Sequence, residues 1–288
     1  MNDAHSQVPP VRQTADVIDF DQPSFRDPEH QQRYARDGYL VPEGVRLPED
    51  ALAALEKFYL DNRHHYADLR YTSTLALGSA REHRVSADQV FRKATDACAR
   101  ELLDGYVQYY GGLGVKAPTG ETAVLELHQD LTMVPYGEGR CGVTLWIPLC
   151  DVGEDNGCLQ VVPGSHLTNR RPRGAGMPFA YRGEADLVAR HLVSLPVKRG
   201  QVVFMDQALI HRSGPNHTPG VRVAAMGMLR PSEASLVYYH LDRGEDGPLL
   251  HRYTVPDDFY LHHRLGSRPE TGEYVGQSRP VVVRHSWD

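Results

Sequence analysis

The segment AVLELHQDL, residues 123–131, places a histidine and an aspartate two positions apart at the end of an apolar run. In a strand, alternation puts Glu126, His128 and Asp130 on one face and the leucines between them on the other. The leucines are then expected to pack between layers, and the polar side chains to line the interior of a small barrel. An imidazole and a carboxylate that point the same way can share one metal ion, so the segment predicts part of a metal site.

His211 is the best candidate for the missing ligand. It ends the strand-like run VVFMDQALIH, 83 residues after His128. Two histidines and one carboxylate on one side of a metal leave three positions open, as in the facial triad of non-haem Fe(II) oxygenases. A second pair of the same spacing, His240 and Asp242, has only 46 residues after it, too few for another set of strands. We therefore expect His128, Asp130 and His211 to bind the metal.

An arginine, Arg222, begins the apolar run RVAAMGML. A guanidinium is costly to bury without an anionic partner, and it binds a carboxylate through two parallel hydrogen bonds. A buried Arg222 near an iron site therefore indicates a dicarboxylate co-substrate. Ser213, two residues after His211, either donates its hydroxyl to the same carboxylate or is a plain turn residue of HRSGPN.

Short apolar runs after Gly112 indicate the fold class. GVTLWIPL, CLQVV, VSLPV, QVVFMD and RVAAMGML are separated by turn sequences such as GEDNG, PGSH and KRG. Many short strands at this spacing are typical of an antiparallel sandwich or barrel. Asn156 with Gly157, and the PGSH sequence, predict tight turns, so His166 is not expected to be a ligand.

The N-terminal part of the chain predicts helices. The run EHQQRYARDGYL predicts a short helix that ends at Gly38, followed by a strand at 39–41. A second helix is expected over residues 48–62. A third is expected to begin with Ser86 as its N-cap and to extend to Gly105.

These elements predict one domain, residues 29–288, that is mainly β with flanking α-helices. A polar segment at 1–28 is expected to be flexible. The core spans about residues 30–230. In the C-terminal extension, 231–288, VYYHLD predicts one more strand and VPDDFYLHHRL a short helix.

Composition excludes several classes of protein. The net charge is −6 and basic residues are spread along the chain, which argues against a nucleic-acid surface. No apolar run approaches the length of a membrane span, and the N-terminus lacks the pattern of a signal peptide. The cysteines have no CxxC spacing and are expected to be reduced, in a cytoplasmic protein; they are Cys98, Cys141, Cys150 and Cys158. Nothing in the sequence indicates an oligomeric state.

Three segments together resemble the phytanoyl-CoA dioxygenase family of Fe(II)- and 2-oxoglutarate-dependent oxygenases. They are HQDL at 128–131, DNGCLQVVPGSH at 155–166, and the run from His211 through Ser213 to Arg222. RYARDGYLVPEGV, near residue 33, resembles the usual N-terminal opening of the family. The resemblance covers roughly residues 30–230.

The resemblance implies a double-stranded β-helix, also called a jelly roll or cupin-like barrel. It implies Fe(II) held by His128, Asp130 and His211, with Arg222 and Ser213 holding the distal carboxylate of 2-oxoglutarate. Trp146 occupies a place where several members line the co-substrate pocket with tryptophan, although it can equally be core filler. The implied reaction consumes O2 and releases succinate and CO2 while a small-molecule substrate is hydroxylated; desaturation or ring closure has the same requirements.

Some questions stay open at this point. Arg170, Arg171 and Arg173 are expected to lie in a solvated loop, or else to meet a phosphorylated or CoA-linked substrate. Glu126 either contacts the substrate or pairs with an arginine. A cupin-like metal-binding isomerase or sensor is an alternative function, but such proteins usually need a His-x-His pair, which this sequence lacks. A second alternative is an oxygenase that acts on protein side chains. The segment 170–187 and the C-terminal extension match nothing in the family, so the substrate is not identified.

Overall fold

The computed structural model describes residues 23–67, 70–75, 80–136, 140–245 and 247–280. Residues 1–22 of the expected flexible segment lie outside this range. Ser24 and Phe25, which belong to the same expected segment, are buried, and Phe25 forms an isolated β-bridge with Leu103. The packed part of the chain therefore begins a few residues earlier than the composition indicates.

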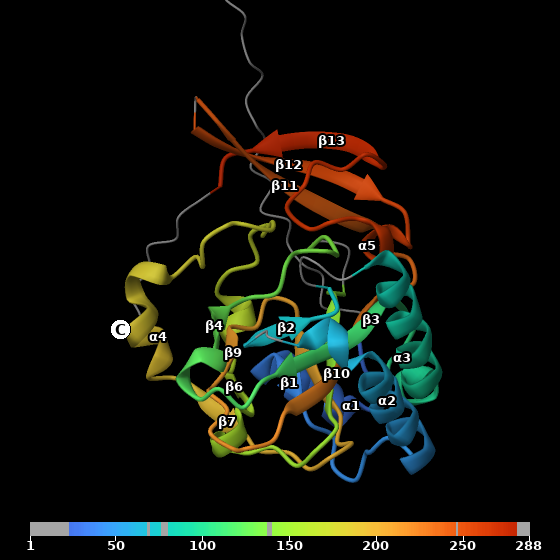
Figure 1. Cartoon of the computed structure of the whole chain (residues 1–288). Coiled ribbons are helices and arrows are strands. Elements are labelled where there is room, and N and C mark those ends of the chain that lie inside the picture. Colours follow the sequence, from blue (N-terminus) through green and yellow to red (C-terminus); the bar gives the residue numbers. More distant parts are fainter. Residues whose placement is uncertain (1–22, 68–69, 76–79, 137–139, 246, 281–288) are drawn as a thin grey trace, which may run out of the picture.

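Two antiparallel sheets form the body of the described residues (Figure 1). The larger has six strands in the order β1-β8-β5-β10-β3-β2, and the smaller has four in the order β4-β9-β6-β7. The larger sheet comprises β1 (Tyr39–Leu40), β2 (Tyr71–Ser73), β3 (Tyr106–Lys116), β5 (Val143–Pro148), β8 (Val203–Asp206) and β10 (Arg222–Pro231). The smaller comprises β4 (Leu125–His128), β6 (Leu159–Val161), β7 (Val193–Leu195) and β9 (His211–Ser213).

The inner faces of these sheets pack on each other. Trp146 and Ala224 of the larger sheet share one buried apolar cluster with Leu159, Val161 and Leu195 of the smaller. Alternation explains the arrangement, because successive residues of a strand face opposite sides. The two-sheet, antiparallel architecture confirms the predicted jelly roll.

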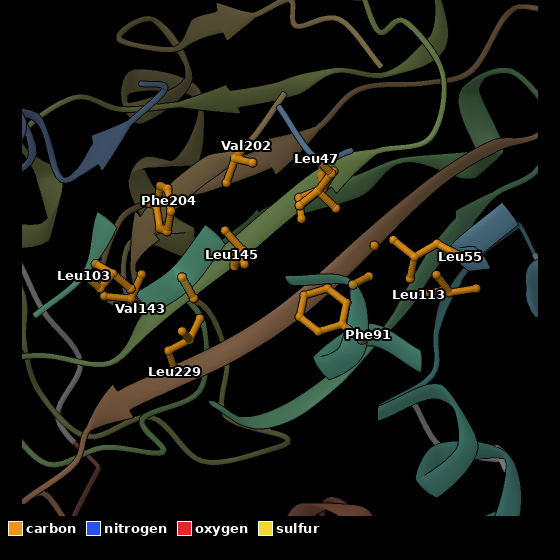
Figure 2. Packing of buried hydrophobic residues seen from close by; sticks show 14 of the residues in the cluster. Leu47, Leu55, Phe91, Leu103, Leu113, Val143, Leu145, Val202, Phe204 and Leu229 are labelled. Atoms are coloured by element: carbon orange, nitrogen blue, oxygen red, sulfur yellow. The ribbon is translucent and has the colours of Figure 1, made fainter. Parts of the chain in front are cut away.

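Helices cover the outer face of the larger sheet (Figures 1 and 2). They are α1 (Pro28–Asp37), α2 (Glu49–Asn62) and α3 (Arg81–Leu102). The short helices elsewhere are α4 (Ala185–Ala189), η1 (Arg63–Tyr66), η2 (Glu121–Ala123), η3 (Glu154–Asn156), η4 (Ser165–Leu167) and η5 (Arg182–Glu184). The predicted end of the first helix is confirmed, since Gly38 adopts the left-handed conformation with φ 77°.

The predicted start of α3 at Ser86 is wrong. The helix begins at Arg81, and the Ser86 hydroxyl donates to the carbonyl of Glu82 one turn earlier. His83 and Arg84 are buried in the extra turn. A polar-looking first turn can therefore belong to the buried face of a helix, which a search for an N-cap does not reveal.

Phe91 of α3 sets the distance between this helix and the sheet. Gly111 on β3 and Gly227 on β10 are paired across the strands. A Cβ atom would lie 2.5 Å from the Phe91 ring if added to Gly111, and 2.1 Å from it if added to Gly227. The two glycines thus create the space in which this fully buried ring packs among the leucines and valines of the core (Figure 2).

A third sheet of the described residues, β11-β12-β13, lies at one end of the molecule (Figure 1). Its strands are β11 (Leu236–Gly244), β12 (Gly247–Val255) and β13 (Glu273–Ser278), with α5 (Phe259–His262) between the last two. The predicted strand and helix of the C-terminal extension are confirmed, whereas β12 and β13 were not predicted. The amide of Val237 donates to the carbonyl of Met133 at 2.9 Å, which joins this sheet to the loop after β4. In the described part of the chain, no helix is both long and apolar enough to cross a membrane.

Candidate metal and carboxylate site

The pairing of β4 with β9 brings two histidines together. His128 is the direct cross-strand partner of His211, and their ring centroids are 4.2 Å apart. The pairing is irregular between Leu125 and His128. Asp130 lies two residues beyond the end of β4, where the chain leaves the sheet.

The three side chains converge on one point. The Nε2 atoms of His128 and His211 each lie 3.9 Å from Oδ1 of Asp130. One potential ligand atom from each residue falls within 4.8 Å of the other two, and no other group of His, Cys, Asp or Glu among the described residues does so. The structure therefore brings together the three residues that were predicted to bind the metal.

The hydrogen bonds of the two imidazoles fix their tautomers. Nδ1 of His128 lies 2.7 Å from the carbonyl oxygen of Glu126, and Nδ1 of His211 lies 2.9 Å from that of Leu209. A carbonyl only accepts, so each Nδ1 carries the proton and donates it. The Nε2 lone pairs are left facing Asp130. This arrangement is typical of metal-binding histidines.

The electrostatics of His128 favour the neutral form that a metal requires. Removal from solvent, with the neighbouring His211, lowers the pKa of His128 to about 4, and Asp130 only partly opposes this. A neutral imidazole offers a lone pair without first losing a proton.

Two residues that were not predicted hold Asp130. The hydroxyl of Thr144 on β5 donates to Oδ2 of Asp130 at 2.6 Å, which leaves Oδ1 directed towards the histidines. Nε of Arg173 donates to the carbonyl of Asp130 at 2.7 Å. The same guanidinium donates to Tyr136 and to the carbonyl of Gln207, so it ties together the segments around the site.

The expected solvated loop is confirmed for Arg171, which is exposed, and is wrong for Arg173. Arg170 is also involved, because its Nη2 lies 3.6 Å from the buried carboxylate of Asp206. Both cations are directed inward towards carbonyl and carboxylate oxygens, which a run of charges does not reveal in the sequence. Thr144 had a detectable signal, since alternation in GVTLWIPL places it on the same face as Trp146.

Arg222 lies on the inner face of β10 and is 2% exposed. Its Nη2 donates to the hydroxyl of Ser213 at 2.8 Å, and its guanidinium lies 5.6 Å from the centre of the Trp146 ring. Its Nε is buried without a hydrogen-bond partner among the described residues. Burial lowers the pKa of Arg222. A buried guanidinium with an unused donor and no acidic partner fits a site for a carboxylate ligand.

The metal cluster and Arg222 are linked through β9. His211 and Ser213 are two residues apart on this strand and so point to the same side. The Ser213 hydroxyl accepts from Arg222 and donates to the carbonyl of Gly157 at 3.0 Å. Gly157 has φ 76°, and a Cβ there would lie 2.5 Å from the carbonyl of Gly214, so the Asn-Gly turn is needed for this close approach.

Two further residues lie outside this cluster. The side chain of Glu126 is exposed, and only its carbonyl contacts the site, through His128. His166 is buried with its Nε2 at 3.1 Å from the carbonyl of Ala35, which it uses to attach α1. The second His-x-Asp pair also lies elsewhere, on β11.

Comparison with known proteins gives a family match over most of this region. The family described as phytanoyl-CoA dioxygenase (PhyH) matches residues 34–224. The peroxisomal phytanoyl-CoA dioxygenase of Rattus norvegicus is 26% identical over 225 residues, 68% of this chain and 66% of that protein. The dioxygenase lolE1 of Epichloe uncinata is 29% identical over 254 residues, 82% of this chain and 89% of that protein. The chain thus spans just under two thirds of the Rattus norvegicus protein.

A solved structure shares the fold. HygX from Streptomyces hygroscopicus, whose crystal structure contains nickel and 2-oxoglutarate, has a TM-score of 0.51 and 18% identity, with 72% of this chain and 88% of that chain covered. The likeness supports the jelly-roll architecture described above.

Proposed function

Because the chain belongs to the phytanoyl-CoA dioxygenase family, we propose that it is an Fe(II)- and 2-oxoglutarate-dependent dioxygenase that oxidises a small molecule. One observation supports this most directly. His211 and Ser213, two residues apart on β9, join a cluster of potential metal ligands to a buried arginine that has no acidic partner among the described residues. An Fe(II)- and 2-oxoglutarate-dependent oxygenase needs both parts in one pocket.

The protein side chains have separate tasks in this proposal. His128, His211 and Asp130 would hold the metal, and the carbonyl-bound Nδ1 atoms keep both imidazoles in the tautomer that leaves Nε2 free. Thr144 keeps one carboxylate oxygen of Asp130 occupied, so the other is presented to the metal. Bound Fe(II) would supply the activation of dioxygen, coupled to the oxidative decarboxylation of 2-oxoglutarate to succinate and CO2.

The co-substrate is oriented at its other end. Arg222 provides the buried positive charge for the distal carboxylate, and Ser213 lies within hydrogen-bond distance of that guanidinium. The Trp146 ring, 3% exposed, forms an apolar wall beside it. Burial strengthens the pairing of guanidinium and carboxylate, because little water competes there.

Hydroxylation of a small-molecule substrate is the outcome that we propose. A carboxylate, Asp130, would take one position of the potential metal site, so a halide ligand would have to displace this carboxylate or compete with oxygen for a position that is left open. We therefore expect oxygen insertion or removal of hydrogen, and no halogenated product.

The test is a turnover assay with the purified protein. Incubation with Fe(II), 2-oxoglutarate and oxygen should release succinate, and the rate should rise when a suitable substrate from a chemically varied panel is added. Mass spectrometry then identifies the oxidised product. A protein that binds neither Ni(II) nor 2-oxoglutarate in calorimetry, and forms no succinate with any compound, would contradict the proposal and favour a metal-free or sensor-like role.

A further inference from the structure

A buried lysine, Lys116, lies beside Arg222 and has no part in the proposal above. It ends β3, where it pairs across the strands with Arg222 on β10 and with Tyr71 on β2. Its side chain is 0% exposed. Among the described residues, neither Lys116 nor Arg222 forms an ion pair with a carboxylate. Two adjacent cations are thus buried without a protein anion, which is costly unless a ligand supplies one.

The hydrogen bonds of Lys116 show which carbonyl groups its ammonium form contacts. Nζ donates to the carbonyl oxygens of Ala123, Ser213 and Gly214, with 3.1 Å to Ser213. An ammonium group has three N–H donors, whereas a neutral amine has two. Three carbonyl acceptors therefore fit the charged form. All three donors are used, so Lys116 does not itself donate to a ligand.

The three carbonyls belong to segments that shape the pocket. Ser213 and Gly214 follow the potential metal ligand His211, and Ala123 lies just before β4. The main chain of Ser213 is held by Lys116 while its hydroxyl accepts from Arg222. Lys116 thereby fixes the position of the group that contacts the guanidinium.

We propose that Lys116 is a positioning residue for the distal carboxylate of 2-oxoglutarate, because it anchors Ser213 beside Arg222 and places a second positive charge behind the guanidinium. This inference rests on the proposed function. It assigns Lys116 an effect on the co-substrate through Ser213 and through its charge, with no direct contact.

The ionisation of Lys116 makes the proposal measurable. Burial, together with the charge of Arg222, lowers the pKa of Lys116 to about 7. Burial raises the pKa of the neighbouring Tyr71, Cys150 and Cys158, so these three groups stay neutral near pH 7. On η2, Glu121 is exposed and directed towards His217, 3.5 Å away.

The sign of the effect follows from these charges. An anion bound near Lys116 stabilises the ammonium form and raises its pKa, so the protein takes up protons when 2-oxoglutarate binds. The affinity for 2-oxoglutarate should therefore fall as the pH rises above 7, by roughly tenfold between pH 6.5 and 8.5. Neither carboxylate of 2-oxoglutarate changes its charge over this interval.

The experiment is calorimetric titration of 2-oxoglutarate into the Ni(II)-saturated protein without oxygen, so that no turnover is involved. Titrations in phosphate and in Tris, whose ionisation enthalpies differ, report the number of protons taken up. Lys116→Met should weaken binding about tenfold or more, abolish the proton uptake and flatten the pH profile, while Ni(II) affinity stays unchanged. Lys57→Met, at an exposed lysine of α2, is the matched control and should behave as the unaltered protein.

The outcomes separate the two proposals. If the unaltered protein binds 2-oxoglutarate with no proton uptake and a flat pH profile, the role of Lys116 is overturned and the proposed function stands. This measurement uses the unaltered protein, so it tests the role of Lys116 even if the Lys116→Met protein does not fold. If the Ni(II)-saturated protein binds no 2-oxoglutarate at any pH, the proposed function fails, and the inference fails with it.

Discussion

The chain contains two His-x-Asp pairs of equal spacing, one at the end of β4 and one within β11, and they have different surroundings. His128 on β4 faces His211 on β9, and Asp130 lies 3.9 Å from the Nε2 atoms of both. His240 on β11 faces His251 on β12 instead, and the cluster does not close around one point.

The carboxylates differ as well. The side chain of Asp130 is 18% exposed and accepts a hydrogen bond from Thr144, whereas that of Asp242 is 54% exposed and 3.8 Å from Nε2 of His251. A spacing of two residues thus brings a histidine and an aspartate close together in both places. The neighbouring strands decide whether they become a metal site.

The largest effect is expected for His211→Ala. Removal of this imidazole leaves two of the three proposed ligands, so we expect Ni(II) affinity to fall more than about 100-fold and succinate formation to be lost. His251→Ala is the matched control, because His251 is the cross-strand partner in the other pair. An equal loss of Ni(II) affinity in the two variants would show that the metal does not depend on the His128 and Asp130 pair. Calorimetry with Ni(II) measures the affinity of both variants.

Arg222→Leu should act on the co-substrate and spare the metal. Loss of a buried charge-assisted contact costs about 2–4 kcal/mol, or roughly 30- to 1000-fold in affinity for 2-oxoglutarate. Arg212→Leu provides a control on β9, since that arginine is half-buried and bonded to Gln160. An unchanged dissociation constant for 2-oxoglutarate in the Arg222 variant would remove this residue from the proposed pocket.

Thr144→Val tests whether the hydrogen bond from Thr144 to Asp130, which has no counterpart at Asp242 among the described residues, matters for metal binding. The valine is similar in size to threonine but cannot donate to Oδ2 of Asp130, so the carboxylate loses its orientation. We expect Ni(II) affinity to fall about tenfold. Thr254→Val, in the C-terminal sheet, should leave it unchanged. If Thr144→Val binds Ni(II) as tightly as the unaltered protein, the hydrogen bond has no role in metal binding.

The smallest effect is expected for His240→Ala. Ni(II) affinity and the rate of succinate formation should stay within about twofold of the unaltered protein, because His240 belongs to the C-terminal sheet and, among the described residues, to no cluster of potential ligands. A loss of metal as large as that of His211→Ala would contradict the difference between the pairs.

The fold could be predicted where a local pattern determines the structure. Gly38 ends α1 because glycine alone adopts the left-handed conformation at low cost, and this is visible in one residue. The start of α3 was missed because burial of His83 and Arg84 depends on contacts with other parts of the chain. Strand β13 was missed for a related reason: most of its residues are exposed, so no apolar alternation marks it.

The sequence predicted the potential metal ligands of the candidate site, but it did not predict the residues that hold them in position. His128, Asp130 and His211 are recognisable by residue type and order along the chain, and the structure brings them together; their role as ligands stays a prediction. Arg173 contacts a main-chain carbonyl, a partner that carries no sequence signal. Lys116 was detectable by the reasoning used for Arg222, since it too is a cation at the end of an apolar strand.

The β4–β9 pairing has a consequence for the order in which the chain folds. His128 and His211 are distant in sequence yet adjacent across the strands, so their meeting requires closure of a long loop, which is a slow event in folding. During synthesis, the metal site cannot form until His211 has left the ribosome. A bound metal would bridge the two strands and oppose their separation, by an amount that grows with metal concentration. If the protein has the proposed function, the availability of iron would be coupled to the stability of the folded barrel as well as to its activity.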